Sequence, residues 1–327
     1  MREIIGKSRL GRSLEGIRLG HGALQVSLIA GCHGDEPVGP AWLSAFVREI
    51  EEDGHPLLEQ ATFRIVPCAN PDGHAANERW WRGGAGAGDL SSYLAHRVRE
   101  LPGDDLEFGF PGGEQGDDGI RPEALAIAGF LAEDGPVHVH GSLHGLGFGA
   151  GPWFLVEPAW SDRIAPYVEE CLSATEKEGL VPHDVDRRGE KGFVRLGPGF
   201  CARPDSRAMR RHFLSSGDFA TASLFRPSSM EFARSLGGDP FTFVTELPLF
   251  LQSDPADPRW PKRISRWTCD LSKAEREGRV EEGAGAVENE ARLDGICPLP
   301  VEAQKRLVGV QVHAAIRLAE RERRARA

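Results

Sequence analysis

The chain has 327 residues, of which 40% are hydrophobic and 27% are charged. This is the composition of a globular protein, and it excludes a disordered, collagen-like or coiled-coil chain. With 39 Lys and Arg residues against 49 Asp and Glu residues the net charge is −10, so neither nucleic acid nor an anionic membrane is expected as a main partner.

The ends and the cysteines of the chain bear on its location. No stretch approaches the ~20 apolar residues that a membrane helix needs, and the N-terminus lacks the apolar core of a secretory signal. The cysteines are scattered and form no C-x-x-C motif: Cys32, Cys68, Cys171, Cys201, Cys269 and Cys297. We therefore expect reduced thiols and a cytoplasmic location.

The first third of the chain has the pattern of a strand, a helix and a second strand. Residues 23–31 form an apolar run typical of a buried strand, and residues 39–50 repeat apolar side chains at helical spacing. Residues 61–70 predict another strand, which the turn sequence Asn70-Pro71-Asp72-Gly73 ends. This succession indicates a βαβ unit and a mainly parallel sheet.

The remaining elements follow with longer gaps. Residues 82–119 are rich in Gly and Asp and are expected to be irregular, and beyond residue 253 the sequence becomes polar and Pro-rich. The predicted elements are helices at 121–134, 164–180 and from 301 on, and strands at 136–145, 153–157 and 241–250. The charged end of the last helix is interpreted as a solvated helix end rather than a nucleic-acid-binding arm.

Taken together, these elements predict an α/β fold with three α/β/α layers around a central mixed, mostly parallel sheet. We expect one catalytic domain at residues 1–260. A partly helical C-terminal extension at residues 261–327 is expected to pack on it.

His33 and Glu36 stand three residues apart directly after the first strand. Ligand sites in parallel sheets form at such strand ends, although a turn histidine beside a helix-capping glutamate is the simpler alternative. A catalytic zinc ion needs three protein ligands and an open position. The strand at 136–145 offers His138, His140 and His144, and we prefer His144 because it stands at the end of the strand.

Glu246 lies within an otherwise apolar strand. A buried ionisable group costs several kcal/mol unless it is paired or used. A carboxylate near a metal-bound water is the usual general base, while the alternative is a structural glutamate in a salt bridge.

The order of these motifs resembles the zinc carboxypeptidase family. The resemblance rests on His33-x-x-Glu36, Asn70-Pro71-Asp72-Gly73, Ser142-Leu143-His144 and Thr245-Glu246-Leu247-Pro248, with support from the opening Gly-x-Ser and Gly-Arg-Ser elements and from the segment at 121–124. It covers roughly residues 4–250, about three quarters of the chain. The sequence of residues 33–37, His-Gly-Asp-Glu-Pro, is most similar to that of one branch of the family. This branch contains murein-peptide amidases and N-acyl amino acid deacylases of the succinylglutamate desuccinylase and aspartoacylase type.

The resemblance implies one Zn²⁺ per chain, held by His33, Glu36 and His144, the set of two histidines and one glutamate known from carboxypeptidase A. It implies Glu246 as general base in the hydrolysis of an amide or peptide bond. Arg79 stands where the family places an arginine that polarises the carbonyl group, and Arg82 is the reserve candidate.

One family motif is altered. The family commonly carries Asp-Leu-Asn-Arg-Asn-Phe-Pro, whose Asn-Arg pair binds the terminal carboxylate of the substrate, and this chain has Glu107 and Phe108 at that pair. A phenyl ring cannot replace a bidentate guanidinium. Asp105 is retained and is expected to orient a zinc-bound histidine. Asn70, Arg82, Glu107 and Phe108 remain candidates for substrate contacts.

Two further departures concern the surroundings of this motif. Residues 83–103 are an extra stretch, and neither Tyr93 nor Tyr167 lies near the strand of Glu246, where the family carries a mobile tyrosine. A substitute for the missing carboxylate clamp would have to come from elsewhere in the chain, and the candidates are Arg97, Arg99, Arg195 and Arg203.

These observations leave several functional hypotheses. The first is a metallocarboxypeptidase-like zinc hydrolase of amide or peptide bonds, and an N-acyl amino acid deacylase or amidase on the same fold is the alternative. The expected partner is a small peptide or an N-acylated amino acid. A non-catalytic metal-binding pseudo-peptidase is a further alternative. A barrel amidohydrolase using His138 and His140 is disfavoured, because the later histidines do not end strands.

Overall fold

The computed structural model of the chain describes residues 1–51, 55–81, 88–254, 257 and 259–326. The strands are β1 (Arg2–Lys7), β2 (Ser13–Leu19), β3 (Leu24–Ala30), β4 (Ala61–Val66), β5 (Val139–Gly149), β6 (Trp153–Val156), β7 (Val194–Gly197), β8 (Phe200–Ala202), β9 (Phe241–Leu251) and β10 (Cys297–Pro298). The helices are α1 (Val38–Ile50), α2 (Pro56–Gln60), α3 (Pro71–Ala76), α4 (Glu78–Trp81), α5 (Leu90–His96), α6 (Pro122–Ala132), α7 (Ala165–Lys177), α8 (Ser206–Ser215), α9 (Phe219–Ala222), α10 (Ser229–Ser235), α11 (Trp260–Arg276), α12 (Val280–Leu293) and α13 (Val301–Arg326), with short 3₁₀ turns η2 (Pro158–Trp160) and η3 (Glu190–Gly192).

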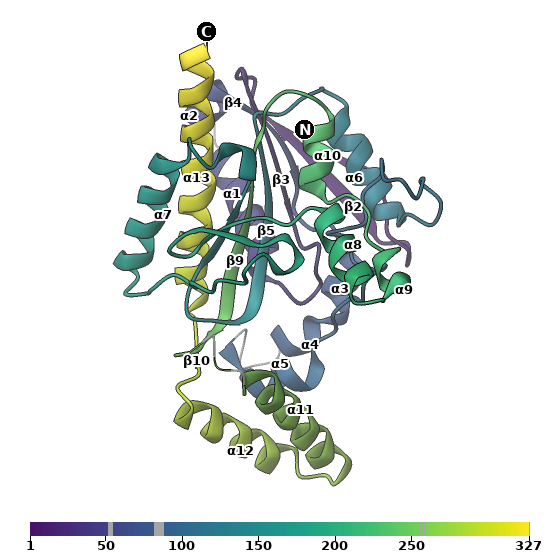
Figure 1. Ribbon diagram of the computed structural model, residues 1–327, viewed down its shortest axis with the longest axis vertical. Coiled ribbons are helices and arrows are strands. Elements are labelled where there is room, and N and C mark those ends of the chain that lie inside the picture. The colour runs from purple at the N-terminus through teal and green to yellow at the C-terminus, as the bar shows by residue number, and fades with distance from the viewer. Residues whose placement is uncertain (52–54, 82–87, 255–256, 258, 327) are drawn as a thin grey trace.

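The described strands form one ten-stranded sheet in the order β1-β2-β4-β3-β5-β9-β6-β8-β7, and β10 pairs with β9 (Figure 1). The four central strands β4, β3, β5 and β9 are parallel to one another. Antiparallel pairs flank them, because β1 and β2 form a hairpin and β6 runs against β9. The predicted α/β fold with a mixed sheet is confirmed, and its parallel part is concentrated in the centre.

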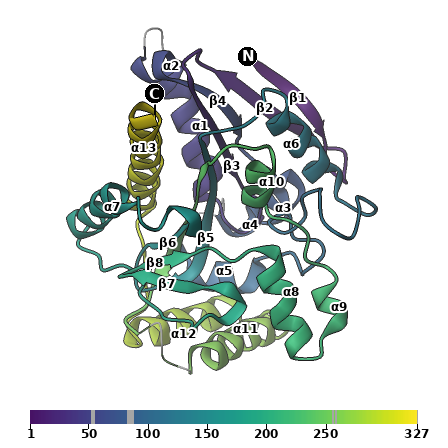
Figure 2. The same ribbon diagram turned by 45° about the horizontal axis from the view of Figure 1, so that its top comes forward.

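Helices cover both faces of the sheet, which gives the predicted three layers (Figure 2). On one face, α1, α7 and α13 bury their apolar side chains against the sheet. On the other face, α6 packs on β2, β3 and β4. Strand β3 carries apolar residues for both faces of the sheet: Val26 and Leu28 point to the α1 side, while Ile29 points to the α6 side.

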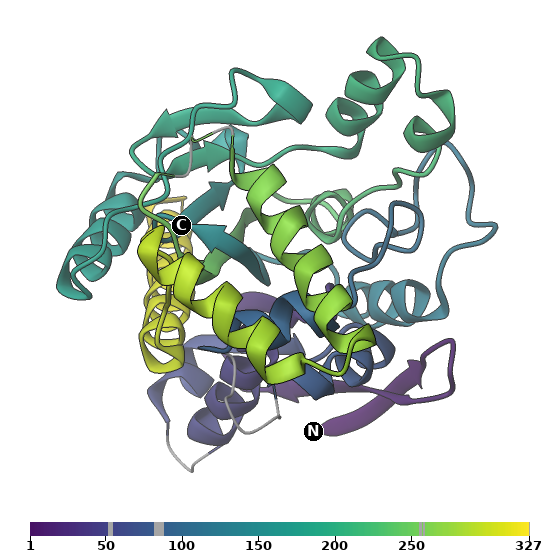
Figure 3. The ribbon, with the colours of Figure 1, turned by 90° about the horizontal axis from the view of Figure 1, so that it is seen from below.

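Helix α5 lies in the stretch that the sequence predicts as irregular, and α11 and α12 lie in or at the start of the extension that it predicts as partly helical. Helix α5 lies within the extra stretch, and α11 and α12 form an antiparallel pair that packs on it (Figure 3). Their apolar residues bury against one another and against the end of the sheet, where Tyr93 of α5 packs on Phe250 of β9 with ring centroids 5.6 Å apart. Trp267, for example, is fully buried in an otherwise polar helix.

The predicted extension at residues 261–327 therefore has two parts. Helices α11 and α12 cover α5, whereas α13 belongs to the main core, where Leu307, Val308 and Val312 are buried beside α1 and α7. Within the described residues, every helix is too short or too polar to cross a lipid bilayer.

His140 gives a prediction about stability. It is fully buried on β5, its Nδ1 atom lies 2.7 Å from Ser27 Oγ, and its Nε2 atom has no hydrogen-bond partner among the residues that the structure describes. Burial, together with the charges of Arg203 and Arg64, lowers the pKa of His140 to about 3. The unfolded chain takes up this proton near pH 6.5, so the folded state loses stability as the pH falls below that value.

We expect this single histidine to cost about 2 kcal/mol at pH 5. His140→Gln removes the titrating group. The difference in unfolding free energy between pH 7 and pH 5, measured by denaturant titration, should be smaller in His140→Gln than in the wild-type chain. Equal pH dependence in the two proteins would contradict a neutral, buried His140.

Candidate metal centre

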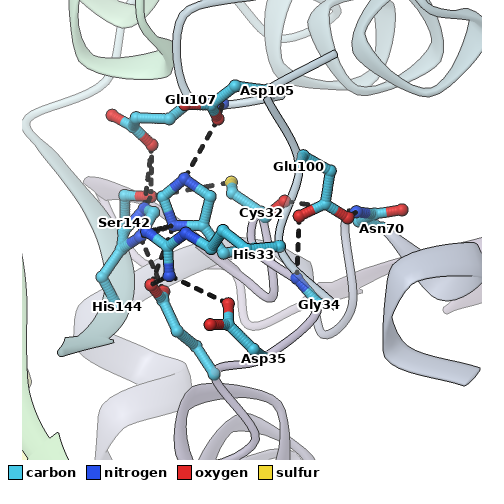
Figure 4. A network of polar contacts seen from close by, with 12 residues as sticks. Cys32, His33, Gly34, Asp35, Asn70, Glu100, Asp105, Glu107, Ser142 and His144 are labelled. Atoms are coloured by element: carbon cyan, nitrogen blue, oxygen red, sulfur yellow. Dashed lines mark hydrogen bonds and ion pairs between the residues drawn. The ribbon is translucent and has the colours of Figure 1, made fainter. Parts of the chain in front are cut away.

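Three side chains meet at the carboxyl ends of the central strands. His33 and Glu36 lie in the loop between β3 and α1, and His144 lies on β5, which neighbours β3 in the sheet. His33 Nδ1 is 2.9 Å from Glu36 Oε1, and His144 Nδ1 is 2.9 Å from Glu36 Oε2. The two Nδ1 atoms are 3.1 Å apart (Figure 4). The structure thus brings together the three residues that the sequence predicts as metal ligands.

The loop that carries His33 is shaped by a close backbone approach. A Cβ atom on Gly34 would lie 2.3 Å from the carbonyl carbon of Gly73, so only glycine fits between the two segments. Asn70 caps α3 through a 3.0 Å hydrogen bond from Gly73 N, which fixes the second segment. The two loops that follow β3 and β4 therefore hold each other in place beneath His33.

A carboxylate lies behind each histidine. His33 Nε2 is 3.0 Å from Asp105 Oδ1, and His144 Nε2 is 2.8 Å from Glu107 Oε2. Both carboxylates come from one short segment, and they lie together on the upper side of the cluster in Figure 4. A carboxylate at Nε2 favours the tautomer whose proton is on Nε2, so both Nδ1 atoms can present lone pairs to a metal ion.

The charges of the cluster favour a bound cation. Burial opposes a charge on His33, but Glu36 and Asp105 outweigh it and raise the pKa of His33 well above its usual value. The pKa of His144 is also raised well above its usual value, because Glu107 and Glu36 outweigh burial. The pKa of Glu36 is lowered well below its usual value, because His33, Arg99 and His144 outweigh burial.

The donor set fits a zinc ion. Two imidazole nitrogens and a carboxylate with lone pairs facing one another at about 3 Å repel unless a cation or protons lie between them. Nitrogen and carboxylate oxygen are ligands that Zn²⁺ accepts, and three protein ligands leave one position for water or substrate. The residues present therefore fit the metal that the sequence predicts.

A second group of candidate donors shares His144. Cys32 Sγ, a Glu107 oxygen and a His144 nitrogen lie within 4.8 Å of one another and are all buried. Burial raises the pKa of the Cys32 thiol, which opposes formation of the thiolate that zinc binds. We therefore favour His33, Glu36 and His144, and the two sets can be told apart by whether sulfur binds the metal.

Glu246 lies beside this cluster on the neighbouring strand. In the parallel pairing of β5 with β9, Glu246 is the direct register partner of His144, so the two side chains lie on the same face of the sheet. No residue of the described chain forms a hydrogen bond or an ion pair with its carboxyl group. Burial and the charge of Glu36 raise the pKa of Glu246 to about 8.

Arg79 and Arg82 are the two arginines predicted to polarise the carbonyl group of the substrate. The side chain of Arg79 is 68% exposed and faces Glu275 on α11 at 3.9 Å, so within the described chain Arg79 does not contact the cluster. The reserve candidate Arg82 lies outside the described residues. Arg79 misses the site because α4 turns its side chain outward, toward the α11–α12 pair.

Of the predicted substrate-contacting residues, Asn70 and Phe108 have structural contacts. Asn70 is buried, caps α3 and accepts a 3.1 Å hydrogen bond from Arg121. The ring of Phe108 packs against Phe225, with ring centroids 5.4 Å apart. The third, Glu107, contacts His144 as described above, so a residue predicted to touch substrate lies behind a candidate metal ligand instead.

Arg99 and Glu100 are the site residues that the sequence does not single out. Arg99 donates hydrogen bonds to Asp35 Oδ1 at 2.9 Å and to Glu36 Oε1 at 2.7 Å. Glu100 accepts hydrogen bonds from Gly34 N at 3.4 Å and from Asn70 Nδ2. The sequence offers Arg99 only as one of four arginines that might bind a carboxylate. The spacing Asp105-x-Glu107 is the one local signal for paired carboxylates, and in the structure a turn brings them together, with Glu107 N donating a 2.7 Å hydrogen bond to Asp105 Oδ1.

The two carboxylates behind the histidines give a testable prediction. We expect Asp105→Asn and Glu107→Gln each to weaken zinc binding by about 10- to 100-fold, because each loses a charged partner that orients a ligand. Competition with a chromophoric chelator measures this change. Asp104→Asn is the matched control, since Asp104 lies in the same segment, is exposed and pairs with Arg9. Unchanged affinity in both variants would show that the carboxylates do not support the ligands.

Residues 2–107 match the family model described as zinc carboxypeptidase. Among solved structures, the carboxypeptidase A from Helicoverpa armigera is 17% identical, with a TM-score of 0.49, over 97% of this chain and 68% of that chain. A metallo-carboxypeptidase from Burkholderia cenocepacia is 14% identical, with a TM-score of 0.48, over 98% of this chain and 64% of that chain.

This chain therefore spans less than two thirds of the Burkholderia cenocepacia protein. The search of curated proteins finds no match. The family match includes His33, Glu36, Asp105 and Glu107, and it ends before His144 and Glu246. The resemblance to zinc carboxypeptidases that the motifs indicate is thus confirmed for residues 2–107, without identifying a branch of the family.

Proposed function

We propose that this chain is a zinc-dependent hydrolase of amide or peptide bonds. The observation that carries the proposal is the convergence of His33 Nδ1, His144 Nδ1 and Glu36 within 2.9–3.1 Å, beside the carboxyl group of Glu246, which has no partner among the described residues. The zinc carboxypeptidase match over residues 2–107 supports a metallopeptidase-like hydrolase.

Each residue has a defined part in this proposal. His33, Glu36 and His144 hold the ion, and Asp105 and Glu107 orient the two histidines. When bound, zinc supplies a Lewis acid that polarises a carbonyl group and makes water more acidic. Glu246 accepts the proton of the attacking water and donates it to the leaving amine, which is the usual work of a carboxylate general base.

The charges around the centre bear on the substrate class. Glu107 stands at the position where the resembling family carries the carboxylate-binding pair, and its carboxylate is held at His144. Further negative charge near the centre comes from the carboxylates of Asp35, Glu36 and Asp105. A free substrate carboxylate at this position would meet repulsion rather than a clamp. We therefore propose substrates that are blocked or acylated there, either small peptides or N-acylated amino acids.

A substrate panel tests this proposal. The zinc-loaded protein is assayed on matched peptides with free or amidated C-termini and on N-acyl amino acids, with chelated protein as the control. We expect zinc-dependent turnover that is at least tenfold faster on the blocked or acylated compounds. A strict requirement for a free C-terminus would overturn the proposed substrate class. Absence of turnover on the whole panel, with zinc bound, would favour a non-catalytic metal-binding protein.

A further inference from the structure

A cavity of about 430 Å³ lies between α8 and α10, which are neighbours in Figure 1, and residues 111–115 and 157–158 form further parts of its wall. Neither candidate donor set of the described chain contributes a residue to its lining. Its most buried arginine, Arg203, donates a 3.0 Å hydrogen bond to Thr242 Oγ1 on β9. Thr242 precedes Glu246 by four residues, which is about 13 Å along a parallel strand. The cavity is therefore distinct from the centre proposed for catalysis.

Arg203 is buried at this cavity and only partly paired. The residue is 6% exposed, and its Nη2 atom donates a 2.8 Å hydrogen bond to Glu157 Oε2. Its Nε atom is engaged by Thr242, as described above. Among the residues that the structure describes, none accepts a hydrogen bond from Arg203 Nη1. Because the guanidinium carries five N–H donors and Arg203 lines the cavity, the N–H groups of Nη1 are available to a ligand there.

A second arginine of the lining, Arg234, also has hydrogen-bond donors to spare. The contacts of its Nη1 atom are long, at 3.5–4.0 Å, and go to Pro240 O, Glu157 Oε2 and Asp239 Oδ1. Such distances are at or beyond the outer limit of a hydrogen bond. Arg203 and Arg234 approach the same oxygen atom of Glu157, so both guanidinium groups can reach one bound carboxylate.

The acidic residues next to these arginines are engaged by the fold itself. Glu231 accepts hydrogen bonds from Ser206 N at 3.0 Å and from Ser206 Oγ at 2.7 Å. Asp205 caps α8 by accepting a 2.6 Å hydrogen bond from Ala208 N, and Glu157 is held as described above. The cavity thus offers free N–H donors beside carboxylates that are already occupied, which suits a ligand that accepts hydrogen bonds.

The lining also bears on the charge and shape of the ligand. It contains four arginines and four Asp or Glu residues, so a ligand with one negative charge fits it better than one with several. Phe225, Pro227 and Phe232 make part of the wall apolar. We propose that the cavity binds an organic monocarboxylate, whose carboxylate accepts hydrogen bonds from Arg203 and Arg234 and whose apolar body packs on the apolar wall. The proposal involves no metal ion and does not depend on the proposed function.

Isothermal titration calorimetry with phenylacetate tests the proposal on the full chain, freed of metal with a chelator and then dialysed. We expect phenylacetate to bind about tenfold or more tightly than phenylacetamide, which has the same ring without the charge. Inorganic phosphate, which has charge without an apolar body, should also bind more weakly. No detectable binding of phenylacetate, or equally tight binding of either other compound, would overturn the proposal. Because the chain carries no metal in this experiment, its result is independent of whether zinc-dependent hydrolysis is found.

Two variants place the bound carboxylate in this cavity. Arg234→Gln and Arg203→Lys should each weaken phenylacetate binding roughly 10- to 100-fold, because each loses charge-assisted hydrogen bonds. Arg203→Lys keeps a positive charge beside the buried Glu157 but loses the planar fork of the guanidinium. If circular dichroism shows that this variant does not fold, Arg234→Gln decides alone. Arg211→Gln is the matched control, since Arg211 is exposed on α8 and does not line the cavity. Unchanged affinity in Arg234→Gln, or an equal loss in Arg211→Gln, would overturn the proposed site.

Discussion

Replacing Glu246 by glutamine is expected to lower kcat by about 10²- to 10⁴-fold while zinc remains bound. Glutamine has nearly the same shape but cannot take the proton of the attacking water. The measurement is kcat on the best substrate of the panel, together with zinc content by atomic absorption. Because Glu246 is the register partner of His144 rather than a candidate ligand, its replacement should leave the metal content unchanged.

The stability of the same variant separates a catalytic from a structural role. In the described structure the Glu246 carboxyl group has no hydrogen-bond or ion-pair partner, and its pKa is raised to about 8. A neutral amide should therefore leave the melting temperature unchanged or raise it. Glu59→Gln, at an exposed position, serves as the control. A kcat within tenfold of the wild-type value, or a large fall in melting temperature, would assign Glu246 to the structure rather than to the chemistry.

His33→Ala and His144→Ala are each expected to abolish hydrolysis by removing one of three metal ligands. Structural zinc sites bind with about 10–16 kcal/mol over four ligands, so one ligand contributes about 3 kcal/mol, or roughly 10²-fold in affinity. Isothermal titration calorimetry with zinc measures this loss. His21→Ala is the control, because His21 is exposed and lies outside both donor sets. Full zinc affinity in either ligand variant would contradict the proposed metal centre.

The centre of the fold could be predicted from the sequence because its signals are local. The apolar runs at residues 23–31 and 241–250 predict β3 and β9 within a few residues, and the turn after residue 70 predicts the end of β4 only approximately. Once these strands are placed in parallel, their carboxyl ends must meet. Residues as distant as His33 and His144 are then expected to lie together, as the structure shows.

Other features depend on contacts that no local pattern encodes. Helices α5, α11 and α12 are stabilised by burying a few side chains such as Trp267 against one another, so their polar composition hides them. Arg79 is turned outward by a short helix, and Arg99 reaches the centre only because Asn77 and Glu100 fix the segment around it. The direction of Glu107 likewise depends on the turn at residues 106–108.

X-ray absorption spectroscopy of the zinc-loaded chain at the zinc edge tests the metal centre most directly. With His33, Glu36 and His144 as ligands, the first shell should contain only nitrogen and oxygen at about 2.0–2.2 Å, with outer-shell scattering from two imidazole rings. A sulfur neighbour at about 2.3 Å would place the ion at Cys32 instead. That result, or a chain that takes up no stoichiometric zinc, would contradict the proposed site.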